Sequence, residues 1–297
     1  MKALYCRAFG PENDLTVEEI DSPVPSAGEV LVSVQAAGLN FPDLLCVRGD
    51  YQFKPPLPFV PGSEGAGLVT AVGEGVSGVS VDDRVCFNGL SGAFAEEIAI
   101  PATAVTQIPD SMLFEQAAGL TIVYGTSYYA LKQRAGLQRG DTLLVLGAAG
   151  GVGLSAVELG AAMGARVIAA ASSEQKLAIA AEHGAEVGID YSKEDLKNRI
   201  KELTDGAGAN VIYDPVGGKV FEASRKCVAW EGRILVVGFA GGEMLDAPMN
   251  QLLFRSYSLV GVYMGEYSHR DRPFLDAIHQ EILDLYAAGK IKPLIHA

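Results

Sequence analysis

The second half of the chain alternates between short apolar runs and amphipathic stretches. We interpret six of the apolar runs as strands: TLLVLGA, RVIAAA, EVGIDY, ANVIYDPV, GRILVVGF and SLVGVYMG. The stretches between them predict helices at roughly 151–163, 174–183, 194–203, 218–229 and 250–256. Continuous apolar strands that alternate with helices are typical of a parallel sheet covered on both faces, and six such strands complete a doubly wound α/β sheet.

The first 120 residues have a different pattern. Short β-branched runs between glycine and proline clusters predict a mostly antiparallel β domain, and these runs are EVLVSVQAAG, GLVTAVGEG, DRVCFNG and FAEEIAI. The segment PPLPFVPG (residues 55–62) is too rich in proline for a helix or a central strand, so we expect a fixed loop. A last helix is predicted from about Arg272 to Ala288, and the following KIKPLIHA begins like a strand. We therefore expect two domains.

A glycine cluster, GAAGGVG (residues 147–153), stands between the first strand of the second half and its following helix. The spacing differs by one residue type from the dinucleotide fingerprint G-x-G-x-x-G, because Ala148 replaces the first glycine. Gly150, Gly151 and Val152 lie where backbone N–H groups meet a pyrophosphate at a helix N-terminus. Gly153 would let the helix approach the strand closely. This loop, at the first of six alternating strands, predicts a bound dinucleotide.

The end of the second strand indicates which dinucleotide binds. No carboxylate ends this strand in AAASSEQK (residues 169–176), whereas a protein that uses NAD carries an acidic residue there for the ribose 2′-hydroxyl. Ser172, Lys176 and Tyr191 offer a hydroxyl, an ammonium and a phenol, which suit a 2′-phosphate. We therefore predict NADPH as the cofactor. Two alternatives stay open: Ser172 could belong to a helix capping box with a solvated Lys176, and Glu174 would repel a phosphate if it pointed inward.

Charge and composition narrow the range of partners. The net charge is -13, the sequence pI is about 4.8, and no run of lysine or arginine could neutralise a row of phosphates, so we expect no nucleic-acid partner. The longest uncharged stretches, 116–131 and 142–157, are too short and too broken by glycine to span a membrane. Because the first residues lack an apolar signal-peptide core, we expect a cytoplasmic protein.

The cysteines and histidines form no recognisable metal or disulfide pattern. Cys6, Cys46, Cys86 and Cys227 are scattered without a C-x-x-C pair, so we interpret them as buried, reduced thiols. His183 ends a predicted helix, where a capping role is expected. His269, His279 and His296 are interpreted as surface or packing residues.

Several longer motifs carry a resemblance to a known family. They are AAGLNFPDLLCVRGDY (36–51), PFVPGSEGAGLVTAVGEGV (58–76), DDRV (82–85), YGTSYYAL (124–131), AAGGVG (148–153), YDPVGG (213–218) and VVGFAGG (236–242). Together they resemble the medium-chain dehydrogenase/reductase superfamily, and within it the zinc-free NADPH:quinone oxidoreductases related to zeta-crystallin. The resemblance covers essentially the whole chain. It implies a GroES-like domain at 1–121, completed by 266–297, and a Rossmann domain at 122–265.

The zinc ligands of this superfamily are missing. Zinc alcohol dehydrogenases carry a cysteine at the position of Asn40 and a histidine at the position of Ser63. No cysteine or histidine occurs between Cys86 and His183, so the third catalytic ligand and the structural four-cysteine lobe are also absent. Because tetrahedral zinc needs such nitrogen and sulfur ligands, we predict no metal.

Without a metal, hydrogen-bond donors must stabilise the oxyanion that forms as hydride arrives from C4 of the nicotinamide. Asn40 is the first catalytic candidate, since it stands at a zinc-ligand position and carries two N–H donors; alternatively it orders its own loop. The resemblance places Tyr51 at the mouth of the substrate cleft as donor or lid, with packing as the alternative, and Leu45 replaces the second tyrosine of the zeta-crystallin pattern. It places Thr126 near the nicotinamide ribose. Phe239, in the turn after a strand, is expected beside the nicotinamide.

The predicted function is an NADPH-dependent, metal-free reduction of quinones or α,β-unsaturated carbonyl compounds. The alternatives are an enoyl or acryloyl thioester reductase and a non-catalytic, crystallin-like NADPH-binding protein. Glu64 and Asp43 are expected to bond backbone groups or arginine rather than act as acids. The resemblance implies a homodimer, and SLVGVYMG (residues 258–265) could pair at the sheet edge across a two-fold axis.

Overall fold

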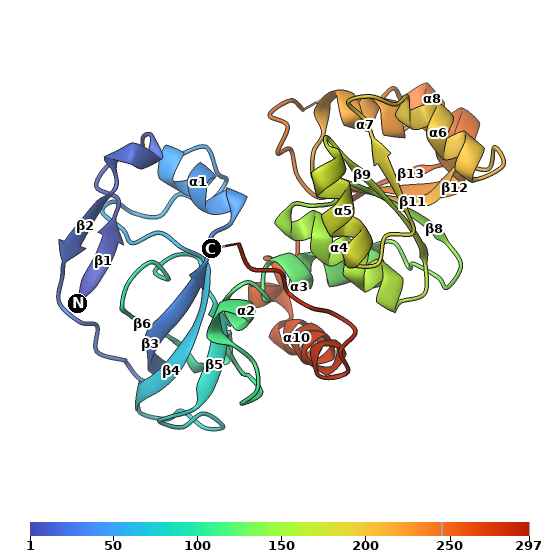
Figure 1. Cartoon of the computed structure of the whole chain (residues 1–297). Helices are drawn as coiled ribbons and strands as arrows, with labels where there is room; N and C mark the ends of the chain where they lie inside the picture. Colours follow the sequence, from blue (N-terminus) through green and yellow to red (C-terminus); the bar gives the residue numbers. More distant parts are fainter. Residues whose placement is uncertain (245, 297) are drawn as a thin grey trace. The chain divides into compact units, whose positions relative to one another are not determined.

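The computed structural model describes residues 1–244 and 246–296 and consists of two compact units (Figure 1). Unit 1 comprises Met1–Ile122, Ser268–His279 and the described residues from Pro293 on, and unit 2 comprises Val123–Tyr267 and Gln280–Lys292. One unit is built on an antiparallel sheet and the other on a six-stranded parallel sheet, which confirms the predicted fold class. The assignment of 1–121 with 266–297 to substrate and of 122–265 to cofactor stays a prediction.

Unit 1 contains a five-stranded antiparallel sheet in the order β6-β3-β4-β5-β7 and a separate two-stranded sheet, β1-β2. The strands are β1 (Lys2–Tyr5), β2 (Thr16–Glu19), β3 (Glu29–Gly38), β4 (Glu64–Val72), β5 (Arg84–Asn88), β6 (Glu97–Pro101) and β7 (Val105–Gln107). The apolar alternation of β3 buries Val30 and Val32 completely, and they pack against Val69 of β4. All four runs that were predicted as strands in this part of the chain contain one.

Two short helices of unit 1 were not predicted: α1 (Phe41–Arg48) and α2 (Phe114–Ala118). Helix α1 begins after Asn40, which is its N-cap, and has a proline in its first turn. It ends at Gly49, whose φ of 76° is the left-handed conformation that glycine favours at a helix end. Asn40, the proline and Gly49 could have predicted α1 from the sequence, but the strand-like segments on either side favoured a β domain.

Unit 2 contains a parallel sheet in the order β10-β9-β8-β11-β12-β13. Its strands are β8 (Thr142–Leu146), β9 (Arg166–Ala171), β10 (Val187–Asp190), β11 (Ala209–Asp214), β12 (Val228–Val236) and β13 (Ser258–Gly261). Counted along the chain this order is 3-2-1-4-5-6, that of a doubly wound dinucleotide-binding sheet. All six predicted strands are confirmed.

Helices lie on both sides of this sheet (Figure 1). They are α4 (Gly151–Ala162), α5 (Glu174–Glu182), α6 (Leu196–Leu203), α7 (Gly218–Ser224) and α8 (Met249–Arg255), with α3 (Val123–Tyr128), the π-helix η3 (Tyr129–Arg134) and α9 (Tyr267–Arg270) elsewhere along the chain. Helix α10 (Arg272–Ala287) contributes its residues up to His279 to unit 1 and those from Gln280 to unit 2.

Two element predictions were wrong. The helix expected at 218–229 ends at Ser224, because Val228 and Ala229 begin β12 and Val228 is the register partner of Ala209. The strand-like start at KIKPLIHA forms no strand among its described residues. Ile291 is buried there, but a strand needs a hydrogen-bonded neighbour, and Pro293 cannot donate a backbone hydrogen bond.

Candidate functional site

The glycine loop of unit 2 has the geometry of a phosphate cradle. Gly150 is the N-cap of α4, so Gly151, Val152 and Gly153 form the first turn, whose N–H groups have no partner within the helix. A Cβ atom on Gly153 would lie 2.2 Å from the carbonyl oxygen of Gly147, so a side chain here would push the helix away from the strand. The structure therefore places the four residues predicted for the pyrophosphate at the N-terminus of α4, which is the positive end of the helix dipole.

A buried hydroxyl cluster holds this loop in place. The Ser127 hydroxyl lies 2.9 Å from the Val152 carbonyl oxygen, 2.9 Å from the Ser155 hydroxyl and 2.8 Å from the Tyr213 hydroxyl. Burial raises the pKa of Tyr213, so the phenol stays neutral. The cluster ties α3, α4 and β11 together, and it fixes the backbone next to Thr126, which is half-buried. These residues were not predicted as site residues, although Ser127 stands in the YGTSYYAL motif and Tyr213 in the YDPVGG motif.

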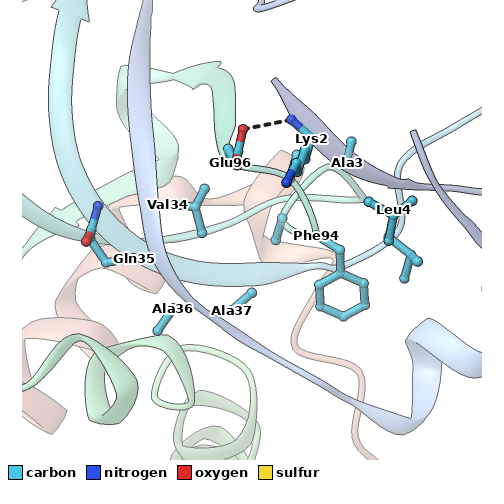
Figure 2. A pocket seen from close by; sticks show the side chains of 12 residues that line it. Lys2, Ala3, Leu4, Val34, Gln35, Ala36, Ala37, Phe94 and Glu96 are labelled. Carbon is cyan, nitrogen blue, oxygen red and sulfur yellow. Dashed lines mark hydrogen bonds between the residues drawn. The ribbon is translucent and has the colours of Figure 1, made fainter. Parts of the chain in front are cut away.

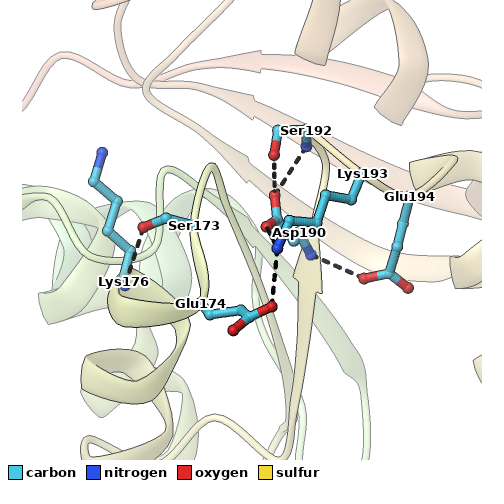
Figure 3. Close-up of polar contacts among 7 residues, drawn as sticks. All are labelled: Ser173, Glu174, Lys176, Asp190, Ser192, Lys193 and Glu194. Carbon is cyan, nitrogen blue, oxygen red and sulfur yellow. Dashed lines mark hydrogen bonds and ion pairs between the residues drawn. The ribbon is translucent and has the colours of Figure 1, made fainter.

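Ser172, Lys176 and Tyr191 lie at one edge of the parallel sheet. The Lys176 ammonium is 3.2 Å from the Ser172 hydroxyl, and the Tyr191 backbone N–H donates to the carbonyl of Ala171, the last residue of β9. The N-cap of α5 is Ser173, whose hydroxyl accepts from the Lys176 backbone N–H at 3.4 Å (Figure 3). The capping alternative for Ser172 was therefore wrong by one residue, and its hydroxyl bonds the Lys176 side chain instead.

Phe239 follows β12 in a turn at the carboxyl end of the sheet. The residue is 38% exposed, and its carbonyl accepts from the Gly242 backbone N–H at 2.8 Å. A Cβ atom on Gly217 would lie 3.2 Å from the Phe239 ring, so this glycine leaves room for the aromatic side chain. Asp214 shapes the same region, since its carboxylate accepts from the backbone N–H groups of Val216 and Gly217.

In unit 1, Asn40 bonds a deeply buried carboxyl group. Its Nδ2 donates to Oε1 of Glu64 at 2.8 Å, while Oε2 accepts from the Thr121 hydroxyl at 2.7 Å and from the Ile122 backbone N–H at 2.8 Å. Glu64 is 1% exposed, and this burial raises its pKa from 4.5 to about 7 against the opposing effect of the three hydrogen bonds. Glu64 can therefore change its protonation state near neutral pH.

The strand register explains why these groups meet. Gly38, the last residue of β3, is the register partner of Glu64, the first residue of β4, so Asn40 follows β3 beside the buried carboxyl. A Cβ atom on Gly38 would lie 2.7 Å from Oε1 of Glu64 and 2.6 Å from the Ala118 carbonyl oxygen. Gly38 thus leaves room for the Glu64 carboxyl and Thr121 donates to it, and neither residue was identified from the sequence.

A second carboxylate holds the backbone of Asn40. Oδ2 of Asp43 accepts from the Asn40 backbone N–H at 2.8 Å, and its Oδ1 accepts from the Ser63 hydroxyl at 2.7 Å. Burial raises the pKa of Asp43, and the bond from Ser63 opposes this shift. Glu64 and Asp43 both bond side-chain and backbone donors around Asn40, and no hydrogen bond from arginine reaches either of them among the described residues.

These donors do not suit a zinc ion. The resemblance implies zinc ligands at the positions of Asn40 and Ser63, but here an amide and a hydroxyl stand there, and each is already hydrogen-bonded to a carboxylate. Tetrahedral zinc sites use thiolate, imidazole and carboxylate ligands. In the part of the chain that the structure describes, no group of three or more such side chains could hold a metal ion.

Tyr51 lies at the other end of α1 from Asn40. Its backbone N–H donates to the Leu45 carbonyl at 3.2 Å, and its side chain is half-buried. The eight residues of α1 stand between the two catalytic candidates along the chain.

A shallow recess of about 370 Å³ also opens on unit 1 (Figure 2). Leu4, Val34 and Phe94 line it, and the Lys2 backbone N–H donates to the Glu96 carboxylate beside it. None of the predicted site residues belongs to its lining. Because the recess is shallow and contains none of the predicted site residues, we assign it no role in the chemistry.

The cysteine prediction is confirmed, since all four cysteines are buried and free. His183 is the C-cap residue of α5, as expected, and its Nδ1 also contacts the Glu158 carboxylate. His279 is buried, which supports packing rather than a surface position. Among the described residues, no helix is both long and apolar enough to cross a membrane.

Comparison with known proteins agrees with both units. Residues 26–110 match the family described as "Alcohol dehydrogenase GroES-like domain", and residues 151–280 match the family described as "Zinc-binding dehydrogenase". The quinone oxidoreductase-like protein 2 homolog of Nematostella vectensis is 46% identical over 300 residues, which cover 100% of this chain and 81% of that relative.

Solved structures agree as well. The quinone oxidoreductase of Pseudomonas syringae has a TM-score of 0.92 at 35% identity, over 98% of this chain and 90% of that one. The Escherichia coli quinone oxidoreductase complexed with NADPH has a TM-score of 0.91 at 31% identity, over 100% of this chain and 91% of that one.

A GroES-like domain followed by a Rossmann sheet defines the medium-chain dehydrogenase/reductase superfamily. Given this fold and these relatives, the chain belongs to the quinone oxidoreductase-like family of that superfamily, which confirms the resemblance.

Proposed function

We propose that this protein is an NADPH-dependent oxidoreductase that reduces quinones or α,β-unsaturated carbonyl compounds by hydride transfer, without a metal ion. The observation that carries the proposal is the contact of the Lys176 ammonium with the Ser172 hydroxyl at the carboxyl end of β9, where no carboxylate ends the strand. The NADPH complex of the Escherichia coli relative supports the same cofactor.

The chain's own residues fit this cofactor. The first turn of α4 would bind the pyrophosphate through backbone N–H groups, and Gly153 keeps that turn close to the end of β8. Ser172, Lys176 and Tyr191 would hold the 2′-phosphate. Thr126 and Phe239 are proposed to contact the nicotinamide end, Thr126 at the ribose and Phe239 beside the ring.

When bound, NADPH supplies the hydride. Asn40 would stabilise the negative charge that develops on the substrate oxygen: Nδ2 carries two hydrogens, Glu64 accepts one, and the second is available to the substrate. Glu64 fixes the orientation of this amide, and Asp43 fixes its backbone. Tyr51 is proposed as a further donor or lid, and a proton from water completes the reduction.

The test follows NADPH oxidation by chelator-treated protein with a naphthoquinone, a simple enone and an enoyl thioester, and repeats each reaction with NADH. We expect turnover of the quinone or the enone that is insensitive to the chelator and much weaker with NADH. Loss of activity after chelation would contradict the metal-free mechanism. Turnover of the thioester alone would favour a thioester reductase, and NADPH binding without any turnover would favour a non-catalytic role.

We also propose a homodimer. β13 is an edge strand of the six-stranded sheet, and an unpaired edge can continue into the sheet of a second copy. A monomer mass in solution scattering would contradict this proposal.

A further inference from the structure

The carboxyl ends of β9 and β10 lie together at one edge of the parallel sheet. Ala171, the last residue of β9, is the register partner of Asp190, the last residue of β10. The residues that follow these strands therefore emerge side by side. After β9 these include Ser172 and Glu174, and after β10 they include Lys193.

Lys193 links the acidic groups at this edge. Its Nζ lies 2.9 Å from Oε1 of Glu174 and 3.7 Å from Oδ2 of Asp190. Figure 3 shows the Glu174 side chain turned toward Lys193 and away from the Lys176 ammonium. The Lys176 ammonium contacts the Ser172 hydroxyl, and among the described residues it forms no ion pair with Glu174 or Asp190.

The Asp190 carboxylate is ionised at neutral pH. Hydrogen bonds from Ser192 hold the pKa of Asp190 below its ordinary value, and the charge of Lys193 adds to this effect. The pKa of Lys193 is in turn raised, first by its bond to Glu174. The Lys193 ammonium therefore faces both carboxylates beside the predicted 2′-phosphate position, and it lies closer to Glu174 than to Asp190.

The sign of the charge at this edge decides between the two nicotinamide cofactors. A phosphate monoester carries about 1.5 to 2 negative charges at neutral pH, and a neighbouring free carboxylate repels it. A ribose hydroxyl, by contrast, donates a hydrogen bond to such a carboxylate, which is how NAD is selected. Glu174 stands only three residues after the end of β9, so the direction of its side chain decides whether its carboxylate faces the predicted 2′-phosphate position.

We propose that Lys193 is a cofactor-specificity residue: by holding Glu174 away and neutralising its charge, it allows the edge of β9 to accept a 2′-phosphate in preference to a 2′-hydroxyl. This inference rests on the proposed NADPH specificity. Lys193 acts through Glu174 in this proposal and makes no contact with the cofactor itself.

The experiment measures the Kd of NADPH and of NADH by titration calorimetry for the wild type, Lys193→Gln, Glu174→Gln and the double variant. Lys193→Gln should weaken NADPH about two- to fivefold and leave NADH unchanged or slightly tighter, because the ion pair is exposed and its effect is modest. Glu174→Gln should tighten NADPH, and the double variant should return close to the wild type. The differences should shrink at high salt.

Lys201→Gln, a lysine removed from the exposed side of α6, controls for the loss of one positive charge and should leave both Kd values unchanged. An equal loss for both cofactors in Lys193→Gln, or no loss, would overturn the inference. So would a double variant as weak as Lys193→Gln, since Lys193 would then act without Glu174. A wild type that binds NADPH no better than NADH would instead refute the proposed cofactor specificity itself.

Discussion

The buried carboxyl of Glu64 predicts a specific dependence of stability on pH. Its pKa rises from 4.5 to about 7 in the folded chain, mainly through burial. Below pH 4.5 the group is protonated in both the folded and the unfolded chain, so its stabilising contribution is fully present. Between pH 4.5 and about 7 the unfolded chain ionises first, and this contribution is progressively lost. The full loss corresponds to about 3 kcal/mol in the free energy of unfolding.

Glu64→Gln removes this titration while keeping the shape of the side chain. We expect the free energy of unfolding of the wild type, relative to that of the variant, to fall by about 2 to 3 kcal/mol between pH 5 and pH 8. Urea unfolding followed by circular dichroism at several pH values measures it. Glu115→Gln, on the exposed surface of α2 in the same unit, controls for the loss of a carboxylate.

A difference between wild type and Glu64→Gln that stays constant from pH 5 to pH 8 would refute the reasoning, because it would mean that Glu64 ionises equally easily in both states. A wild type that gains stability relative to Glu64→Gln as the pH rises would refute it more strongly, since the carboxylate would then be stabilised by its three donors beyond the cost of burial.

Three further substitutions test the two halves of the proposed site. Asn40→Ala should lower kcat about 100-fold without changing the Kd of NADPH, as expected for loss of an oxyanion donor; a change confined to the Kd would contradict this role. Gly153→Ala should destabilise the protein by about 1–3 kcal/mol and weaken NADPH binding, because its Cβ would lie 2.2 Å from the Gly147 carbonyl oxygen. Gly150→Ala is the control: its Cβ would lie 3.4 Å from the same oxygen, so this variant should unfold like the wild type in denaturation experiments. Lys176→Ala should weaken NADPH by about 1.5 kcal/mol and NADH hardly at all, and equal losses in calorimetry would remove Lys176 from the phosphate site.

The sequence by itself determined most of unit 2. Apolar runs such as TLLVL and RVIAAA are buried on both faces of a parallel sheet, so their periodicity and length identified the strands without tertiary information. The glycine loop was equally readable, because the steric demand at Gly153 comes from Gly147, only six residues earlier. A contact between residues this close along the chain can be predicted from the sequence alone.

Tertiary structure decided the environment of Asn40 and the charge balance beside β9. Glu64 lies 24 residues from Asn40 and 57 from Thr121, and Lys193 lies 19 residues from Glu174. Only the pairing of β3 with β4 and of β9 with β10 brings these groups together. The raised pKa of Glu64 has the same origin, since burial depends on the whole packed domain and the residue type alone cannot reveal it.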